Sequence, residues 1–142
     1  MKALSGYAEW FWLIAKNWKD IENRNWSLAR YSKTSQLPAR VYLHASKTPT
    51  SRREINFIRI LLNPDQLHEF DSVDWSKYRG CIIGEVTITG QVTAEDVGHP
   101  ATHSPWFFGT YGFVVKDGIL YDHPIPCRGQ LGFFQPDLAS TV

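Results

Sequence analysis

The stretch that decides the fold reads CIIGEVTITGQV and covers residues 81–92. Ile82, Val86 and Ile88 recur at a period of two, with Gly84 between them, and this is the period of a β-strand. Polar residues occupy the alternate positions, namely Glu85, Thr87 and Thr89. The stretch therefore predicts a strand that buries one of its two faces.

Three further runs, rich in β-branched and aromatic residues, predict more strands. They cover residues 40–45, 111–115 and 131–134. The tripeptide Lys116-Asp117-Gly118 follows the second run and predicts a hairpin turn there.

Helical periodicity is concentrated in the first half of the chain. Apolar residues between positions 6 and 17 recur at helical spacing and predict a mostly buried helix. Ser51 and Glu54 have the spacing of a capping box, which predicts the start of a second helix. Asn63-Pro64 ends that helix and begins a short third helix that runs through Phe70. Early helices combined with several turn-linked strands favour an α+β fold, with an antiparallel sheet or small barrel, over a β-α-β fold.

Length and composition narrow the class of protein. The 142 residues are enough for one domain with its own core, and the aromatic content of 14% argues against a disordered chain. A net charge of +1 excludes proteins that coat duplex DNA with a strongly basic surface. No apolar run is long enough to span a bilayer, and Cys81 and Cys127 belong to no CxxC motif. We therefore expect a cytoplasmic protein with reduced cysteines and no membrane partner.

The densest polar cluster is Lys19-Asp20-Ile21-Glu22-Asn23-Arg24, which lies between Trp18 and Trp26. If this segment is extended, Glu22 and Arg24 share one face and are placed to pair. Such a pair is either a partly exposed ion pair of little energetic weight or part of a functional site.

Three histidines raise the question of catalysis or metal binding. His44 ends the predicted strand at residues 40–45, a position that suits either a general base or a hydrogen-bonded structural residue. His99 and His103 have a spacing compatible with two metal ligands. Since no third ligand can be identified from the sequence, we predict no metal site.

A loop rich in aromatic residues, at residues 103–110, precedes the predicted strand at residues 111–115. We call it the aromatic loop. Trp106 and Phe107 in this loop either stack a nucleobase or fill one end of a small barrel. The sequence has no Gly-rich phosphate loop, no G-x-S-x-G motif and no H-E-x-x-H motif. The common nucleotide-binding, serine-hydrolase and zinc-protease signatures are thereby excluded.

Three blocks of sequence together resemble the ASCH domain family, a branch of the PUA-like superfamily. The first block joins residues 4–10 to WKDIENRNW at 18–26, the second is VYLHASKT at 41–48, and the third combines 84–89, 104–115 and 125–134. Residues 50–77 match no motif of the family and are predicted to be a helical insert.

The resemblance implies a single domain over residues 1–142, built as a small mixed or antiparallel PUA-like β-barrel flanked by helices. It also implies a cleft beside the first helix that binds single-stranded RNA or a modified nucleoside without a cofactor. The family's ligand-facing segment corresponds here to Lys19, Glu22, Asn23 and Arg24. On physical grounds, Trp26 or Trp106 is available to stack a base beside them.

Two alternatives to a binding protein remain open. Some small ASCH members resemble amidohydrolases that act on N4-acylated cytidine through a lysine, a threonine and a glutamate, and others have been described as metal-dependent ribonucleases. Glu22 stands where the amidohydrolase-like members have the threonine, so a hydroxyl nucleophile is missing there. The catalytic candidates for a hydrolase are Lys19, Glu22, His44 and Ser104, with a divalent metal needed only by a ribonuclease. The other alternative is a protein-interaction module whose exposed aromatic side chains bind a partner.

The charge of Lys19 depends on two opposing influences. Desolvation would lower the pKa of Lys19, whereas a nearby Glu22 would keep the amine protonated. With Glu22 so close in sequence, we expect Lys19 to remain a cation that binds a phosphate or a carbonyl.

Overall fold

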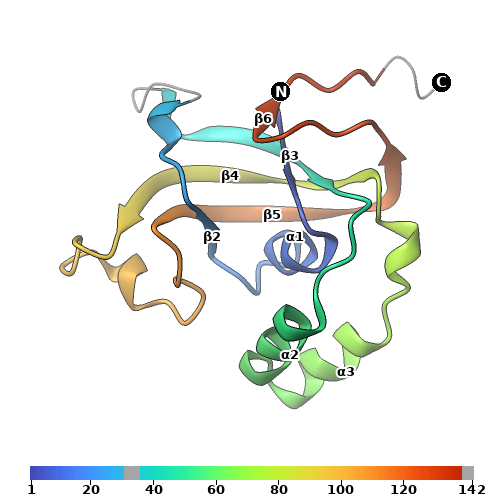
Figure 1. Cartoon of the computed structure of the whole chain (residues 1–142), viewed down its shortest axis with the longest axis horizontal. Coiled ribbons are helices and arrows are strands. Elements are labelled where there is room, and N and C mark those ends of the chain that lie inside the picture. The colour runs from blue at the N-terminus through green and yellow to red at the C-terminus, as the bar shows by residue number, and fades with distance from the viewer. Residues whose placement is uncertain (31–35, 139–142) are drawn as a thin grey trace.

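A computed structural model of the chain describes residues 1–30 and 36–138. Its centre is a six-stranded mixed sheet with the strand order β2-β5-β4-β3-β1-β6, which curls into a half-barrel (Figure 1). The strands are β1 (Ala3–Gly6), β2 (Ile21–Arg24), β3 (Ala39–Ala45), β4 (Cys81–Thr93), β5 (Tyr111–Pro126) and β6 (Phe133–Phe134). Only β1 and β3 run parallel, and the other neighbours are antiparallel. The prediction of an α+β fold with a barrel-like sheet is confirmed.

The strand that decides the fold has the predicted alternation from Glu85 to Thr89. At its start the alternation fails, because Ile82 and Ile83 are both fully buried and the register with β5 shifts between Ile82 and Gly84. Val86 and Ile88 in β4 are buried, whereas Thr89 is exposed. The strand occupies the middle of the sheet, between β3 and β5, so its buried face forms much of the core.

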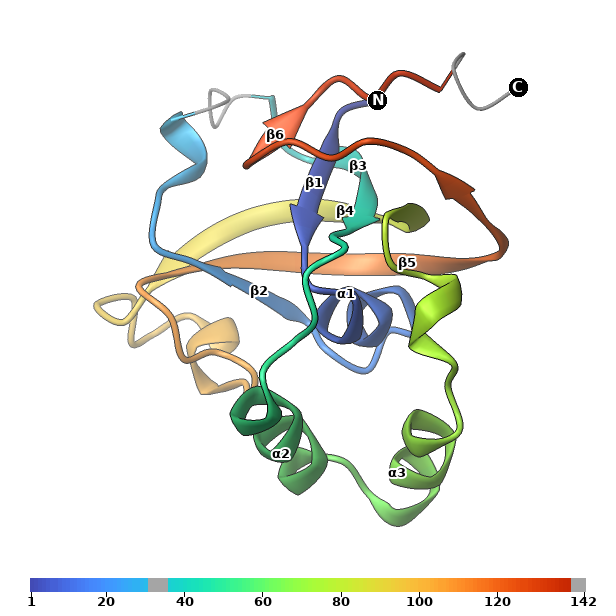
Figure 2. The same cartoon turned by 45° about the vertical axis from the view of Figure 1, so that its right-hand side comes forward.

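Three helices cover one side of the sheet. They are α1 (Ala8–Ala15), α2 (Arg52–Leu61) and α3 (Pro64–Asp71), accompanied by the short 3-10 helices η1 (Leu28–Arg30), η3 (Trp75–Lys77) and η4 (Pro100–His103). Helix α1 lies against β3, β4 and β5, and α2 and α3 lie beyond α1 (Figures 1 and 2). Trp12 joins these layers, since its ring meets Phe70 of α3 at 6.1 Å and Trp75 of η3 at 5.5 Å. None of the helices in the described ranges is long and apolar enough to cross a membrane.

The predicted helix starts are confirmed. The Ser51 side chain accepts a hydrogen bond from the backbone N–H of Glu54 at 3.2 Å, which begins α2. Asn63 and Gln66 form a complete capping box at the start of α3. The helix between positions 6 and 17 is shorter than predicted, because Gly6 belongs to β1 and Asn17 has a positive φ of 61°.

The predicted hairpin turn at Lys116-Asp117-Gly118 is wrong. Strand β5 continues from Tyr111 to Pro126, and Asp117, at a φ of 57°, forms a bulge where β5 has one residue more than β4. The side chain of Asn17 accepts from the N–H of Gly118 at 2.7 Å and donates to its carbonyl at 2.9 Å. Residues typical of a turn therefore form a bulge that attaches β5 to the end of α1.

Gly84 in β4 has a close neighbour that leaves no room for a side chain. A Cβ at this position would lie 2.1 Å from the carbonyl oxygen of Ile119 on β5, whereas a Cβ at Gly90 in the same strand would meet nothing within 4 Å. We expect Gly84→Ala to lower the free energy of unfolding by about 1–3 kcal/mol, because the two strands must separate. Urea unfolding of Gly84→Ala measures this change, with Gly90→Ala as the matched control. Equal losses of unfolding free energy in the two variants would contradict the close contact between Gly84 and Ile119.

Candidate functional site

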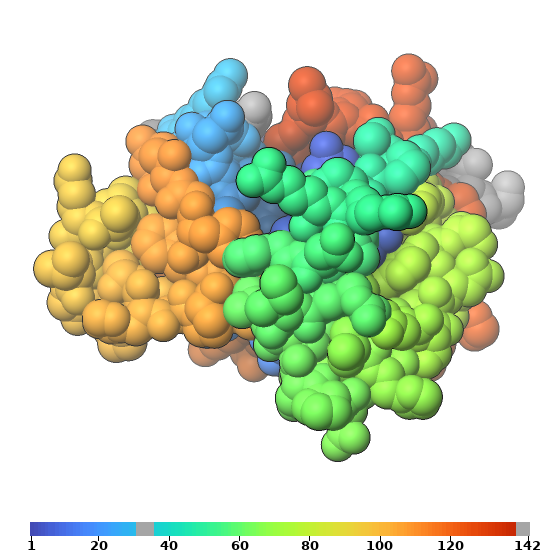
Figure 3. Space-filling view, turned by 60° about the horizontal axis from the view of Figure 1, so that its bottom comes forward, coloured from blue at the N-terminus to red at the C-terminus, as the bar shows by residue number. Residues whose placement is uncertain are grey.

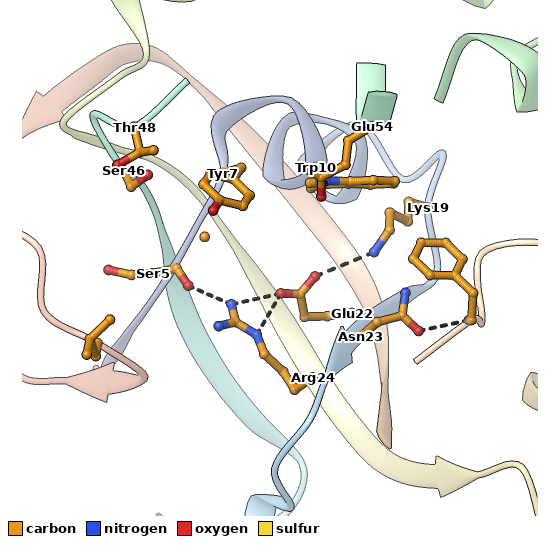
Figure 4. Close-up of a pocket in the computed structure, with 13 residues that line it drawn as sticks. Ser5, Tyr7, Trp10, Lys19, Glu22, Asn23, Arg24, Ser46, Thr48 and Glu54 are labelled. Atoms are coloured by element: carbon orange, nitrogen blue, oxygen red, sulfur yellow. Dashed lines mark hydrogen bonds and ion pairs between the residues drawn. The ribbon is translucent and has the colours of Figure 1, made fainter. Parts of the chain in front are cut away.

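A cavity of about 450 Å³ opens between β1, α1 and β2 (Figure 4). Its wall also includes Ser46 and Thr48 from the connection between β3 and α2, Glu54 of α2, and Phe108 from the aromatic loop. This volume lies in the usual range for pockets that hold small molecules. We call it the first cavity.

Three charged side chains meet inside the first cavity. One carboxylate oxygen of Glu22, Oε2, accepts from Nε of Arg24 at 2.9 Å and lies 2.8 Å from its Nη2. The other oxygen, Oε1, lies 3.5 Å from Nζ of Lys19. Figure 4 shows the amine and the guanidinium approaching Glu22 from opposite sides. Lys19 is 2% and Glu22 8% exposed, so the pair between Glu22 and Arg24 is not a surface ion pair.

The local structure explains why these side chains converge. Strand β2 pairs with β5 through Ile21 and Val114, which extends the charged segment and places Glu22 and Arg24 on one face. Lys19 precedes the strand and donates to the carbonyl of Ile21, which turns its amine back toward Glu22. The predicted pairing of Glu22 with Arg24 is confirmed.

Burial dominates the protonation of Lys19. Desolvation lowers the pKa of the amine below its usual 10.5, and Glu22 offsets part of this effect through its charge and its hydrogen bond. The amine is therefore easier to deprotonate than an ordinary lysine, which differs from the influence of Glu22 that we expected to prevail.

Arg24 is held firmly and still has donors to offer. Its Nη2 donates to the carbonyl oxygen of Ser5 at 2.5 Å, while Nε and Nη2 hold Glu22. Within residues 1–30 and 36–138, Nη1 makes no hydrogen bond to protein. One arm of a preorganised guanidinium is thus left for a ligand.

Asn23 anchors the aromatic loop. Its Nδ2 donates to the carbonyl of Trp106 at 2.8 Å, and its Oδ1 accepts from the N–H groups of Phe108 and Gly109, each at 3.0 Å. Its amide is therefore engaged by the loop, although Asn23 also borders the first cavity. Through these bonds β2 determines where Phe108 lies.

The aromatic walls of the first cavity differ from the tryptophans predicted to stack a base. Trp106 is buried and meets Trp10 edge-on at 6.4 Å, and Trp26 packs on Phe113 at 5.4 Å. Neither Trp106 nor Trp26 lines the cavity. The rings that do line it are Tyr7, Trp10 and Phe108.

Few of these wall residues are indicated by the sequence. The short strand β1 was not predicted, so Ser5 and Tyr7 had no assigned place. Trp10 lies within the helix that is predicted to be mostly buried, yet its indole N–H donates to Glu54 of α2 at 3.3 Å. The one indication of these wall residues in the sequence was that residues 4–10 and 41–48 belong to the blocks resembling the ASCH family.

His44 and Ser104 lie away from Lys19 and Glu22. Nε2 of His44 donates to the carbonyl of Cys127 at 2.7 Å, which leaves Nδ1 to accept from the hydroxyl of Ser5 at 3.2 Å. His44 lines a second cavity and not the first. The hydroxyl of Ser104 donates to Asp20 at 2.5 Å and lines neither cavity. Of the four catalytic candidates, the structure brings together Lys19 and Glu22.

The burial of His44 makes the free energy of unfolding depend on pH. Burial lowers the pKa of His44 below the usual 6.5, with the hydrogen bond to Cys127 opposing the shift. The unfolded chain therefore binds a proton more readily, so this contribution to stability is complete above pH 6.5 and is lost as the pH falls through the lowered pKa. Between pH 7 and pH 5, we expect the free energy of unfolding to fall less in the His44→Gln variant than in the unsubstituted protein. Urea unfolding at both pH values checks this, and parallel losses would contradict it.

The described residues contain neither a grouped set of metal ligands nor a disulfide. In the part of the chain that it describes, no three His, Cys, Asp or Glu residues are grouped to hold a metal ion. His99 accepts a hydrogen bond from the N–H of Ala101 and caps η4. Cys81 and Cys127 are free thiols, and burial raises the pKa of each.

Comparison with known proteins adds no relative. No protein-family model matches this chain, and no curated protein matches it. The resemblance to the ASCH family therefore stays a prediction, and the geometry of the first cavity is what supports a function.

Proposed function

We propose that this chain is an ASCH-type, PUA-like protein of the cytoplasm whose first cavity binds one base of single-stranded RNA or of a modified nucleoside. The observation that carries the proposal is the convergence of Lys19, Glu22 and Arg24 in one cavity with aromatic walls. The proposed binding needs no cofactor.

The polar groups of the first cavity suit the edge of a base. Glu22 supplies a hydrogen-bond acceptor, while Lys19 and the free arm of Arg24 supply donors. A base edge also alternates donors and acceptors, so one base can satisfy all three side chains. Because these groups hold one another in place, little ordering is needed when the ligand binds.

The charge balance favours a base over a phosphate at this position. Glu22 and Glu54 both line the first cavity, and each would repel a phosphate placed beside it. A neutral base avoids this repulsion and accepts hydrogen bonds from the cations through its carbonyl. A phosphate and a carbonyl were the two acceptors expected for Lys19. We therefore assign the carbonyl to it.

The aromatic walls supply a stacking surface. The ring of Phe108 lies 5.6 Å from Trp10 and 5.1 Å from Phe57 of α2. In the space-filling view, the aromatic loop (orange) lies against α2 (green) (Figure 3). Base stacking on such rings is worth about 1–3 kcal/mol per base and tolerates different bases.

Removing the Phe108 ring tests the proposal. We expect Phe108→Ala to raise the Kd for cytidine, N4-acetylcytidine and short single-stranded RNA about tenfold, through loss of stacking. Ile119→Ala is the matched control, because Ile119 is 50% exposed, as against 49% for Phe108, and lies away from the cavity. Titration calorimetry measures both variants. The absence of saturable binding to every one of these ligands, or equal weakening by both substitutions, would refute the proposal.

The amidohydrolase alternative has one observation in its favour, the lowered pKa of the Lys19 amine. A neutral amine would take a proton from a water molecule as that water attacks an amide carbonyl. The ammonium would return the proton to the leaving nitrogen as the C–N bond breaks, and the products would be a carboxylic acid and an amine. Incubation with N4-acetylcytidine distinguishes the alternatives, because the release of acetate that disappears in Lys19→Met indicates hydrolysis, whereas binding without release indicates a binding protein.

The protein-interaction alternative also has one observation in its favour. Phe57 and Ile60 of α2 are exposed, with Ile60 at 80%. Stoichiometric co-purification of a protein partner, combined with no affinity for any nucleoside or RNA, would favour this alternative.

A further inference from the structure

A second cavity, of about 930 Å³, adjoins the first. The two cavities share Ser5, Ser46 and Leu131 among their lining residues. The second one lies at the end of β3 and the start of β4, and residues 126–131 form another of its walls. These residues belong to the segment that leaves β5 and crosses over β1 toward β6 (Figure 2). Because of the shared lining residues, the two cavities are neighbours, close enough for one extended ligand to contact both.

The second cavity carries positive charge. Among the described residues that line it, none is Asp or Glu, and three are cations, namely Lys47, Arg79 and Arg128. Two carboxylates lie nearby. Glu9 accepts from Nη2 of Arg79 at 3.0 Å, and Asp137 lies close to the thiol of Cys127. The cations still outnumber the carboxylates, although the net charge of the whole chain is only +1.

Two buried donors at this cavity lack an acceptor. Within residues 1–30 and 36–138, Nη1 of Arg79 and Oγ of Ser46 are the buried side-chain polar atoms without a hydrogen-bond partner. Leaving such groups unsatisfied is unfavourable, so their presence calls for an explanation. Both residues line the second cavity, and the bond between Glu9 and Arg79 fixes the guanidinium in place.

We propose that the second cavity binds a phosphate group of the same ligand whose base occupies the first cavity. A phosphate accepts hydrogen bonds from both a guanidinium and a hydroxyl, so a phosphate in the second cavity satisfies Arg79 and Ser46 once their buried donors turn toward it. Lys47 and Arg128 add attraction from the exposed side of the cavity. The ligand is thus a nucleotide, either free or as a unit of single-stranded RNA.

The division of charge between the two cavities supports this assignment. Glu22 and Glu54 line the first cavity and disfavour a phosphate there, whereas the second cavity has cations and unsatisfied donors. Ser46 belongs to both cavities, so it marks the point where the sugar would pass from one to the other. This inference rests on the proposed function, because it places the base in the first cavity.

The test compares ligands that differ by one phosphate. Cytidine, cytidine 5′-monophosphate, cytidine 3′-monophosphate and inorganic phosphate are titrated separately by calorimetry at one ionic strength. We expect one of the monophosphates to bind about tenfold more tightly than cytidine, with a preference that weakens as salt is added. The double variant Lys47→Ala with Arg128→Ala should lose this preference and keep its affinity for cytidine, because neither residue lines the first cavity.

A charge-matched control uses Arg52→Ala with Lys77→Ala, two exposed cations that line neither cavity. Two results would overturn the phosphate site and leave the proposed function standing. In the first, cytidine binds and neither monophosphate binds more tightly than cytidine. In the second, a monophosphate binds more tightly, and the double variant of Lys47 and Arg128 keeps this preference. Failure of cytidine and both monophosphates to bind would overturn the two proposals together. Binding of inorganic phosphate that is lost in the double variant would support the phosphate site independently of any base.

Discussion

Replacing Glu22 by alanine is expected to lower the free energy of unfolding by about 3–5 kcal/mol. Glu22 is the one carboxylate between the buried amine of Lys19 and the guanidinium of Arg24. Its removal leaves the two cations without the carboxylate that bridges them, in a place where water has little access. The loss is therefore far larger than the truncation of an exposed carboxylate would cause.

Glu69→Ala provides the matched control, because Glu69 pairs with Lys16 at 2.6 Å on the surface. Exposed pairs of this kind contribute about 0–1 kcal/mol. Urea unfolding of both variants measures the difference. Similar small losses in both would contradict a buried, tightly coupled arrangement at Lys19, Glu22 and Arg24.

Exchanging Arg24 for lysine is expected to raise the Kd for the base-containing ligand about thirtyfold or more. Lysine keeps the positive charge and loses the planar fork, so it cannot hold Glu22 and Ser5 while also donating to a ligand. Disturbing a buried, hydrogen-bonded charge pair at a binding site usually costs about 2–5 kcal/mol of affinity. Calorimetric titration with the tightest-binding cytidine derivative gives the value.

Arg40→Lys controls for the general effect of this exchange. Arg40 pairs with Glu85 through Nε at 2.5 Å, is similarly accessible, and lies outside the first cavity. We expect its substitution to leave the Kd unchanged. Unaltered binding by Arg24→Lys, or equal weakening by both variants, would show that the fork of Arg24 has no part in recognition.

Elements defined by local patterns were predictable from the sequence. The alternation of β4 from Glu85 to Thr89 and the capping residues Ser51 and Asn63 act through neighbours within a few positions, and each has its predicted role. The pairing of Glu22 with Arg24 was predictable for the same reason, since residues two positions apart in an extended strand share a face.

Features that depend on distant partners were not predictable. Strand β1 has four residues and exists because β3 lies beside it, in parallel, and β6 on its other side. The bulge at Asp117 replaces the predicted turn because Asn17, far away in sequence, bonds to Gly118. Local propensity favoured a reversal of the chain, and tertiary contacts prevailed over it.

The residues of the candidate site fall into the same two groups, those whose partners are near in sequence and those whose partners are distant. Lys19, Glu22 and Arg24 are close in sequence and were identified together. The roles of Asn23 and Arg79 depend on partners in the aromatic loop and in α1, so no local pattern indicated them. Trp10 was missed as a wall of the first cavity because an aromatic residue at helical spacing looks the same whether it faces the core or a ligand.

The most direct test is to locate the bound ligand on the protein. Titration of ¹⁵N-labelled protein with N4-acetylcytidine, followed through amide chemical shifts, shows which residues the ligand meets. The proposed binding mode predicts the largest shifts at the amides of residues 5–7 and 22–24 and at the indole N–H of Trp10, with little change in η4 at residues 100–103. Saturable binding with its shifts gathered elsewhere, and none in β1 or β2, would contradict the claim that the first cavity is the ligand site.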